Sequence, residues 1–444
     1  MKTSNLSLDQ APPEDIPLRY LLTGPAFGIL AGILLSVFGE RIFITAWSLD
    51  TVALVHMITL GWLTLIMIGA FYQMVPVLVG GHVPWNHLSR INYYSLVSGI
   101  LSLISGFLFW KIILLKSAAV LLLVSFSLFI TQILTALFRV KANRPVVYAM
   151  RSSVICLTLA VTAGITMIGV LYGWWGFPLD GYSLKYIHIT FALLGWITLL
   201  IFGVSFHVIP MFYLTKAFPD RIGYSIVTLI LLSIVSLVIG FGMKLNGTRL
   251  IVAGIPAFIG VILYVFTLFN LIRNRQRKMV DSTFRFWQLG LTCLIPALLL
   301  LTVDPFRWDE IFGYLFVITF LIGFACSVSN GMLYKIVPFL IWLHRFSPLV
   351  GKIKTPAMKD IIADAPARKQ FYLFCLSFIL IVVCCIFPVD LLIRIAGVSW
   401  SVSSIILFFL QIKAIKIQPP EVPKATGMDD FAAMFKDLPP PPPK

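Results

Sequence analysis

The stretch that decides the fold is HMITLGWLTLIMIGAFYQMVP, residues 56–76. Its pattern returns in HITFALLGWITLLIFGVSFHVIP, residues 188–210, and in GFACSVSNGMLYKIVP, residues 323–338. In each copy a second glycine lies eight positions after the first. An aromatic residue lies three positions after the second glycine, and a proline lies four positions after the aromatic residue. These residues are Gly61, Gly69, Tyr72 and Pro76; Gly195, Gly203, Phe206 and Pro210; and Gly323, Gly331, Tyr334 and Pro338. One pattern at three places predicts an internal threefold repeat.

The composition is that of a membrane protein. Hydrophobic residues make up 59% and charged residues 12% of 444 residues, and the mean hydropathy is +0.97, whereas a soluble domain has about 25% charged residues. A helix needs about 20 apolar residues to span a bilayer. We therefore expect an all-α membrane protein with twelve spans, at residues 18–38, 51–79, 93–111, 117–139, 152–176, 187–215, 222–243, 249–273, 285–303, 311–341, 370–389 and 391–413.

The twelve predicted spans divide into three sets of four, and the motif lies on the second span of each set. The sets are residues 18–139, 152–273 and 285–413, between an N-terminal segment (1–17) and a Pro-rich tail (414–444) expected to be disordered. Matching motifs predict matching places in a pseudo-threefold ring of helices.

Lys and Arg in the connecting loops predict the orientation. The loops after the even-numbered spans hold 18 of these residues and the opposite loops 8, which by the positive-inside rule places both termini in the cytoplasm. We expect a multi-pass protein of a bacterial inner membrane. The net charge of +16 suits anionic lipid head groups and requires no nucleic acid.

Two histidines stand out inside the apolar spans. His56 precedes the first motif glycine by five residues and His188 by seven, so both are expected near the periplasmic face. A second polar position lies twelve residues after the first glycine of each copy, occupied by Gln73, His207 and Lys335. Intramembrane polar residues are costly and usually face a bundle interior, so these three predict a polar pore position; hydrogen bonding between helices is the alternative.

The stretches at 56–76 and 188–210 resemble the tenth helix of the heme–copper oxidase catalytic subunit, especially in C-family oxidases and nitric oxide reductases. There His-x-His precedes Leu-Gly-Trp, Gly, Tyr and Pro at the same spacing. The chain is also similar to smaller NnrS-type heme proteins. The resemblance covers the whole chain as topology, twelve helices in three arcs of four, but only the motif helices by sequence. It implies an oxidase subunit I-like bundle and a heme.

The resemblance does not extend to the oxidase active site. In that family the first His of the pair binds the high-spin heme and the second the low-spin heme. Here His188 stands at the first position and His56 at the second, and the complementary places hold Thr190 and Leu54. The third copy has Phe316 and Ile318 instead. The span at 222–243, where the family has copper ligands, contains no His, so we expect no copper centre and no oxygen or nitric oxide reduction; whether the protein is an enzyme stays open.

The ring geometry of that family implies that His56 and His188 face each other across one pore, where they could bind a heme b from both sides. Trp62 and Trp196 could stack on the macrocycle, and periplasmic cations could pair with its propionates, namely Lys185, Arg249 and Arg307. This hypothesis predicts electron transfer, a nitric oxide response or support of a respiratory complex. Partners would be oxidase subunits or a cytochrome that meets the acidic segment at residues 304–310.

Three other interpretations stay open. The two histidines could be polar packing residues without a cofactor. The chain could be a transporter or channel through the pseudo-threefold pores, with Gln73, His207 and Lys335 at an inner gate. It could also be a cofactor-free assembly or scaffold protein.

Overall fold

The computed structural model describes residues 12–141, 144–174, 176, 178–245, 247–303, 311–351 and 353–420. The expectations for residues 1–11, for the acidic segment at 304–310 with Arg307, and for the tail beyond residue 420 lie outside the described residues.

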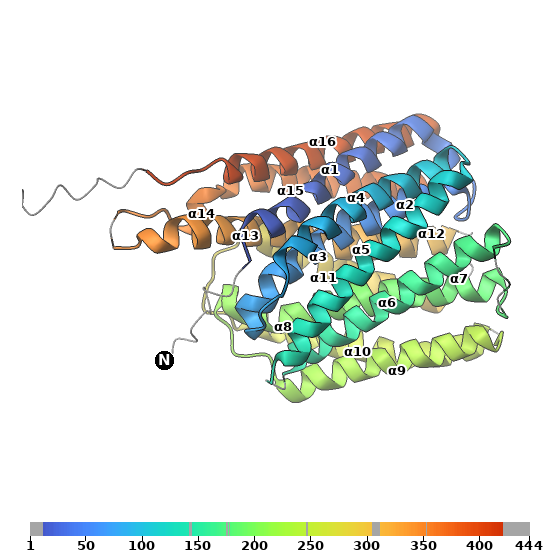
Figure 1. Ribbon diagram of the computed structural model, residues 1–444, viewed down its shortest axis with the longest axis horizontal. Helices are drawn as coiled ribbons and strands as arrows, with labels where there is room; N and C mark the ends of the chain where they lie inside the picture. The colour runs from blue at the N-terminus through green and yellow to red at the C-terminus, as the bar shows by residue number, and fades with distance from the viewer. Residues whose placement is uncertain are drawn as a thin grey trace, which may run out of the picture.

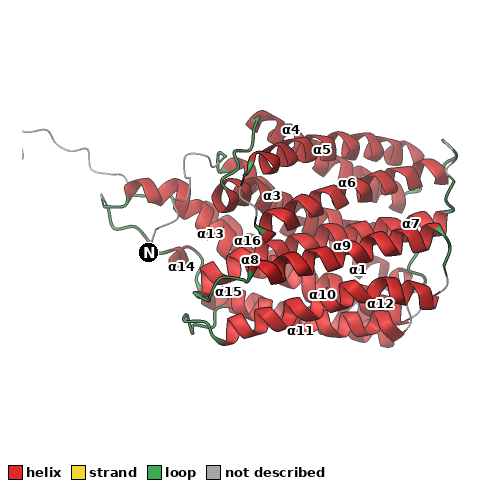
Figure 2. Cartoon of the chain, turned by 90° about the horizontal axis from the view of Figure 1, so that it is seen from below, coloured by secondary structure: helices red, strands yellow, loops and turns green. Residues whose placement is uncertain are grey.

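All secondary-structure elements named in the described part of the chain are helices (Figure 2). The α-helices are α1 (Asp15–Phe38), α2 (Leu49–His56), α3 (Leu65–Met74), α4 (Asn86–Leu108), α5 (Ile112–Arg139), α6 (Pro145–Leu171), α7 (Gly181–Ile189), α8 (Leu199–Tyr213), α9 (Asp220–Gly242), α10 (Gly247–Arg273), α11 (Ser282–Val303), α12 (Ile311–Ile318), α13 (Ser327–Ile341), α14 (Met358–Ile361), α15 (Asp364–Ile386) and α16 (Asp390–Ile415). Short 3₁₀ segments are Gly39–Phe43 and Ser347–Leu349. The π-helical segments are Met57–Thr64, Val75–Val79, Thr190–Thr198, Thr319–Cys326 and Trp342–Phe346.

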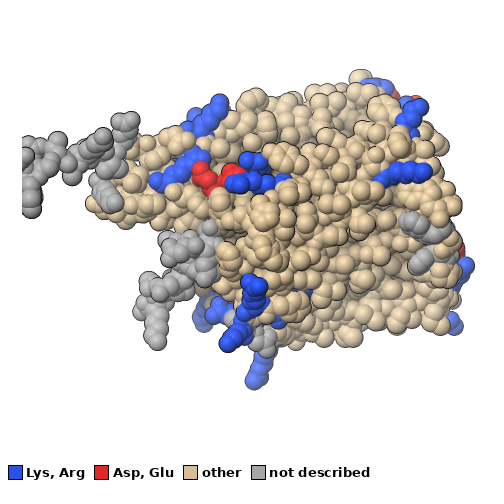
Figure 3. Space-filling view, in the orientation of Figure 1, with Lys and Arg blue, Asp and Glu red and all other residues tan. Residues whose placement is uncertain are grey.

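These helices join into twelve segments that are long and apolar enough to cross a membrane. The segments are Asp15–Phe43, Leu49–Val77, Asn86–Leu108, Ile112–Arg139, Pro145–Leu171, Gly181–Tyr213, Asp220–Gly242, Gly247–Arg273, Ser282–Leu300, Ile311–Leu349, Asp364–Ile386 and Asp390–Ile415. They run along one common direction (Figure 1), and the charged side chains of the face in Figure 3 gather toward its two ends. The prediction of an all-α chain with twelve spans is therefore confirmed for the described residues, and the span ends differ by up to eight residues.

Both ends of the described chain lie at the same end of the bundle, which we call the terminus end; the other is the far end (Figure 1). Arg345 ties the two ends together. Its guanidinium contacts the Glu14 carboxylate at 2.8 Å and donates to the carbonyls of Ile415 and Ile417 at 2.6 and 2.7 Å. One planar side chain with several donors can serve all three acceptors at once.

Each motif span is π-helical at its first glycine. The segments Met57–Thr64, Thr190–Thr198 and Thr319–Cys326 contain Gly61, Gly195 and Gly323 respectively. Wide π-helical turns are rare in proteins and are frequent at functional sites. Their occurrence at one motif position in three spans shows that the motif has a common backbone conformation.

The motif glycines allow close packing against the first span of each set. A Cβ at Gly61 would come within 2.5 Å of Phe27 on α1, and one at Gly323 within 2.8 Å of Cys293 on α11. A Cβ at Gly195 would collide with Cys156 on α6. Small residues let membrane helices approach in this way.

A buried hydrogen-bonded triad links the second, third and fourth spans of the first set. The Asn92 side-chain amide donates to the Tyr72 hydroxyl at 2.9 Å, and the Ser125 hydroxyl donates to Asn92 Oδ1 at 2.5 Å. The Tyr72 hydroxyl in turn donates to Gln132 Oε1 at 3.0 Å. The triad of Tyr72, Asn92 and Ser125 is buried, as is Gln132 beside it, so these contacts satisfy polar groups that would otherwise be costly in the bundle.

The third set has a triad of the same residue classes. The Tyr334 hydroxyl donates to Gln370 Oε1 at 3.1 Å, and the Gln370 amide donates to the Ser403 hydroxyl at 3.0 Å. Counted from the motif and from the helix starts, the matching positions of the second set hold the apolar or small residues Phe206, Ile226 and Gly260. A Cβ on Gly260 would lie 3.4 Å from the Ile226 carbonyl oxygen, so these two positions face each other. All three polar groups are thus replaced together.

Candidate functional site

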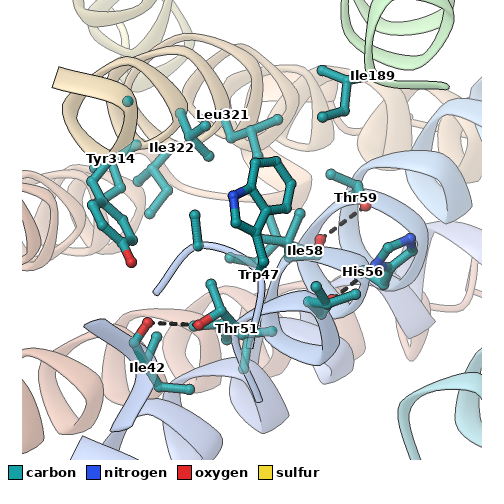
Figure 4. A pocket seen from close by; sticks show the side chains of 18 of the residues that line it. Ile42, Trp47, Thr51, His56, Ile58, Thr59, Ile189, Tyr314, Leu321 and Ile322 are labelled. Carbon is teal, nitrogen blue, oxygen red and sulfur yellow. Dashed lines mark hydrogen bonds between the residues drawn. The ribbon is translucent and has the colours of Figure 1, made fainter. Parts of the chain in front are cut away.

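A largely apolar cavity of 260 Å³ lies between the three motif spans, toward the far end of the bundle (Figure 4). Its walls come from α2, α7, α12 and the π-helical segments that follow them, with contributions from α1, α15 and α16. Both His56 and His188 line it, together with Trp47, Lys185, Tyr314 and Trp400 among others.

The two helices that carry the histidines begin with similar side-chain caps. The Ser48 hydroxyl caps α2 by accepting from the Thr51 N–H, and the Asp180 carboxylate caps α7 by accepting from the Ser183 N–H. His56 and His188 each stand eight residues after their cap, or about 12 Å along a helix at 1.5 Å per residue. Relative to the motif glycines the two histidines differ by two residues. Relative to the caps, the two histidines therefore stand at the same position along their helices.

The structure brings the two imidazoles together. Their ring centroids are 6.2 Å apart and their planes are inclined by 19°. His56 Nδ1 lies 2.8 Å from the Val52 carbonyl oxygen, one turn back on its own helix (Figure 4). His188 Nδ1 lies 2.8 Å from the Ala160 carbonyl oxygen on α6. A carbonyl can only accept, so each Nδ1 carries the proton and each Nε2 has a free lone pair.

Each imidazole has the hydrogen bond to a carbonyl that is common among metal-ligating histidines. A metal-bound imidazole typically donates its other N–H to a carbonyl or carboxylate, which fixes its tautomer and orientation. Within the described part of the chain, Nε2 of His56 and of His188 has no hydrogen-bond partner. Metal–nitrogen bonds are about 2.0–2.1 Å and an imidazole centroid lies about 1.1 Å behind its nitrogen, so two imidazoles on opposite sides of one ion have centroids about 6.3 Å apart. The observed distance of 6.2 Å between the centroids is compatible with one shared ion.

The donor set is too small for a bare ion. No group of three or more His, Cys, Asp or Glu that could hold a metal occurs among the described residues. A protein site for zinc or copper usually supplies at least three such ligands. A heme supplies the four equatorial nitrogens itself, so that two axial imidazoles complete its iron. The residues present therefore fit a heme iron better than a free ion.

The far end of the cavity carries a cation and aromatic rings. Lys185 Nζ lies 3.3 Å from the ring centroid of Trp47 and 4.9 Å from that of Tyr186. Lys185 follows the α7 cap and precedes His188 by three residues, so both side chains lie on one face of the helix. Of the cations that the sequence singles out, Lys185 lines the cavity and Arg249 does not. The repeated motif does not point to Trp47 or Trp400, because neither belongs to it.

The motif tryptophans are not part of the cavity lining. Trp62 is buried against Trp400, with ring centroids 5.3 Å apart, and Trp196 stacks on Phe71 at 5.8 Å. The Trp196 indole N–H also donates to Thr64 Oγ1 at 3.1 Å. Both tryptophans therefore act in helix packing here, and Trp400 is the indole that reaches the cavity.

The three residues of the polar pore position have different environments. Gln73 is buried, and neither polar atom of its side chain has a partner in the described structure. Lys335 Nζ forms an ion pair with Asp281 at 2.6 Å. His207 is half-buried on α8. None of the three lines the cavity that holds the histidine pair.

Comparison with known proteins adds no assignment: no family model matches the chain, and no curated protein matches it.

Proposed function

We propose that this multi-pass membrane protein binds one heme b between His56 and His188 and serves in electron transfer, in a response to nitric oxide or in support of a respiratory complex. The observation that carries the proposal is the imidazole pair, 6.2 Å apart, with both Nδ1 atoms held by backbone carbonyls. The same proposal includes both termini in the cytoplasm of a bacterium, as the loop charges predict.

We also propose that the bundle is a pseudo-threefold repeat like the oxidase catalytic subunit. Three features support it: the π-helical turn at each first motif glycine, the packing of that glycine on the first span of its set, and the polar triads of two sets. A symmetric origin explains why the second set lacks all three polar groups of the triad. A single substitution would have left buried polar groups without partners.

The cavity must widen when the cofactor enters. Its 260 Å³ is just below the roughly 300–1,000 Å³ of sites for organic ligands, so side chains of the lining such as Trp47 and Leu54 have to move outward. The apolar walls exclude water, and Lys185 at the far end suits the propionates. Arg249, outside the lining, would need a shift of α10 to contribute.

The histidine pair determines the kind of chemistry. A bound heme supplies one-electron reduction and oxidation at its iron. His56 and His188 would both hold the iron, which would favour electron transfer or sensing over oxygen chemistry. The Val52 and Ala160 carbonyls strengthen the imidazoles as donors and hold their rings in place. Terminal oxidase activity is therefore not expected.

Absorption spectra of the detergent-purified protein, recorded in the oxidised state and after reduction with dithionite, test this function. We expect the sharp spectrum of a low-spin b-type heme in the parent protein. His56→Ala and His188→Ala should each lose the heme or become high-spin. Loss of a residue that only hydrogen-bonds to a metal ligand lowers affinity by about 10–100-fold, and loss of the ligand itself should lower it further. His207→Ala is the matched control and should keep the parent spectrum, because His207 lies outside the cavity.

Two outcomes would overturn the proposal. One is a parent protein without a Soret band, even after heme supplementation during expression. The other is a heme spectrum that survives unchanged in both His56→Ala and His188→Ala, which would place the heme elsewhere.

A further inference from the structure

A second cavity, of 60 Å³, lies between the same three motif spans, closer to the terminus end. It is lined along α3 by Ile66, Met67, Ala70, Phe71 and Met74, along α8 by Leu200, Ile201 and Val204, and along α13 by Val328, Ser329, Met332 and Ile336. Met150 on α6 and Trp287 on α11 complete the lining. These positions repeat every three or four residues, so one face of each motif helix looks into the cavity.

Four methionines surround this space without filling it. Met67, Met74, Met150 and Met332 all line the cavity, although Met is the side chain that most readily fills irregular gaps. A volume of 60 Å³ exceeds the about 10–15 Å³ that a single water needs. Flexible side chains thus border a space that is large enough for a small occupant.

The donors of the lining are soft. The described lining contains no His, Cys, Asp or Glu, which are the ligands that zinc, magnesium and calcium need. Thioether sulfur selects Cu(I) among the common biological metals. Phe71 and Trp287 also line the cavity, and aromatic faces attract a monovalent cation.

One buried polar group independently indicates an occupant. Trp287 is buried, and its indole N–H has no hydrogen-bond partner in the described structure. A buried donor of this kind needs an acceptor, and Trp287 is among the residues that line this cavity. A water molecule bound to a metal ion would accept from this N–H through its oxygen.

We propose that this cavity binds one Cu(I) ion through the thioethers of Met67, Met150 and Met332, with Met74 as a further donor on the side of the terminus end. Met67 and Met74 follow the first motif glycine of their span by 6 and 13 residues, and Met332 follows its own by 9. Met332 therefore lies three residues beyond the level of Met67 and four before that of Met74. These steps are about 4.5 and 6 Å along the helix axis, so Met332 can share an ion with either neighbour.

This site is separate from the histidine pair and does not depend on the proposed heme. Both cavities lie between the motif spans, but they share no lining residue. The expectation of no copper centre concerned the histidine ligands of the oxidase family, and the present donors are thioethers.

The test is a titration of the detergent-purified, full-length protein with Cu(I) under anaerobic conditions, against a chromogenic Cu(I) chelator as competitor. We expect one ion per chain with a sulfur-dominated X-ray absorption spectrum. Met332→Leu and Met67→Leu should each weaken binding by about tenfold or more, because each removes a ligand. Leu replaces Met at nearly the same volume, so both variants should fold.

Two matched controls separate the site from general methionine effects. Met167→Leu alters the histidine cavity and Met211→Leu an exposed position on α8, and both should bind Cu(I) like the parent protein. The proposal is overturned if the parent binds no more Cu(I) than the Met332→Leu/Met67→Leu double variant, or if nitrogen and oxygen dominate the absorption spectrum. A parent protein that binds Cu(I) but shows no Soret band would reject the heme and leave this site standing.

Discussion

Removal of the Tyr72 hydroxyl tests whether the polar triads stabilise the bundle. Tyr72→Phe breaks the contacts at 2.9 Å from Asn92 and at 3.0 Å to Gln132, and leaves the Asn92 amide with an N–H that lacks its partner. A buried polar group without a partner costs about 1–3 kcal/mol. Hydrogen bonds between membrane helices average about 0.6 kcal/mol, with a maximum of about 1.7. We therefore expect a loss of about 1–2 kcal/mol in the free energy of unfolding.

The second set offers the reverse experiment. Phe206→Tyr introduces a hydroxyl beside Ile226 and Gly260, where the first and third sets have an amide and a serine. Alone it should destabilise the protein by about 1–3 kcal/mol, since the new hydroxyl lacks a partner. Combined with Ile226→Asn, it should form the contact that Tyr72 makes with Asn92. The double variant should then be more stable than the sum of the single changes by at least about 0.6 kcal/mol.

The free energy of unfolding can be measured by SDS titration in mixed micelles, with near-ultraviolet circular dichroism and gel filtration as checks on folding. Phe202→Tyr is unsuitable as a control because its ring already stacks on Tyr264 at 3.6 Å; Phe269→Tyr, at an exposed position, is suitable. The reasoning is refuted if Tyr72→Phe changes stability by less than about 0.3 kcal/mol, or if the changes at Phe206 and Ile226 are simply additive.

Two glycines give further predictions. Gly164→Ala places a Cβ 3.1 Å from Cε1 and 3.3 Å from Nδ1 of His188, so it should displace that ring and shift the absorption bands or the midpoint potential of a bound heme; an unchanged potential would contradict the site. Gly28→Ala drives a Cβ into the Trp62 indole and should cost about 1–3 kcal/mol by overpacking, measured by the same SDS titration. Gly254→Ala, with open space around it, serves both experiments as the control and should be neutral in each.

The spans were readable from the sequence because length and hydropathy are local properties. A run of about 20 apolar residues crosses a bilayer whatever its neighbours are. The predicted span at 93–111 begins seven residues late, because the first two turns of α4 (Asn86–Leu108) are polar. The motif spacing likewise indicated the packing faces, since glycines eight apart come close to one face of a helix.

His56 and His188 were also candidates from the sequence, because buried imidazoles in apolar spans are rare and costly. The ring geometry of the family that the motif resembles also predicted that they face each other, and the ring centroids lie 6.2 Å apart. In both spans a π-helical segment lies between the histidine and the glycine, so the spacing in sequence does not by itself give the rotation between them. Such turns depend on packing against other spans, and no local sequence pattern predicts them.

By itself, then, the sequence determined the class, the twelve spans, the spacing of the motif and the two imidazoles, all of which depend on neighbours along the chain. Only the tertiary structure decided which side chains share a cavity: His188 with the Ala160 carbonyl, Trp400 in place of Trp62, and Met150 beside Met332. The physical reason is that contacts between helices are determined by close packing of side chains distant in sequence, and helical periodicity states which face is buried but not what it meets.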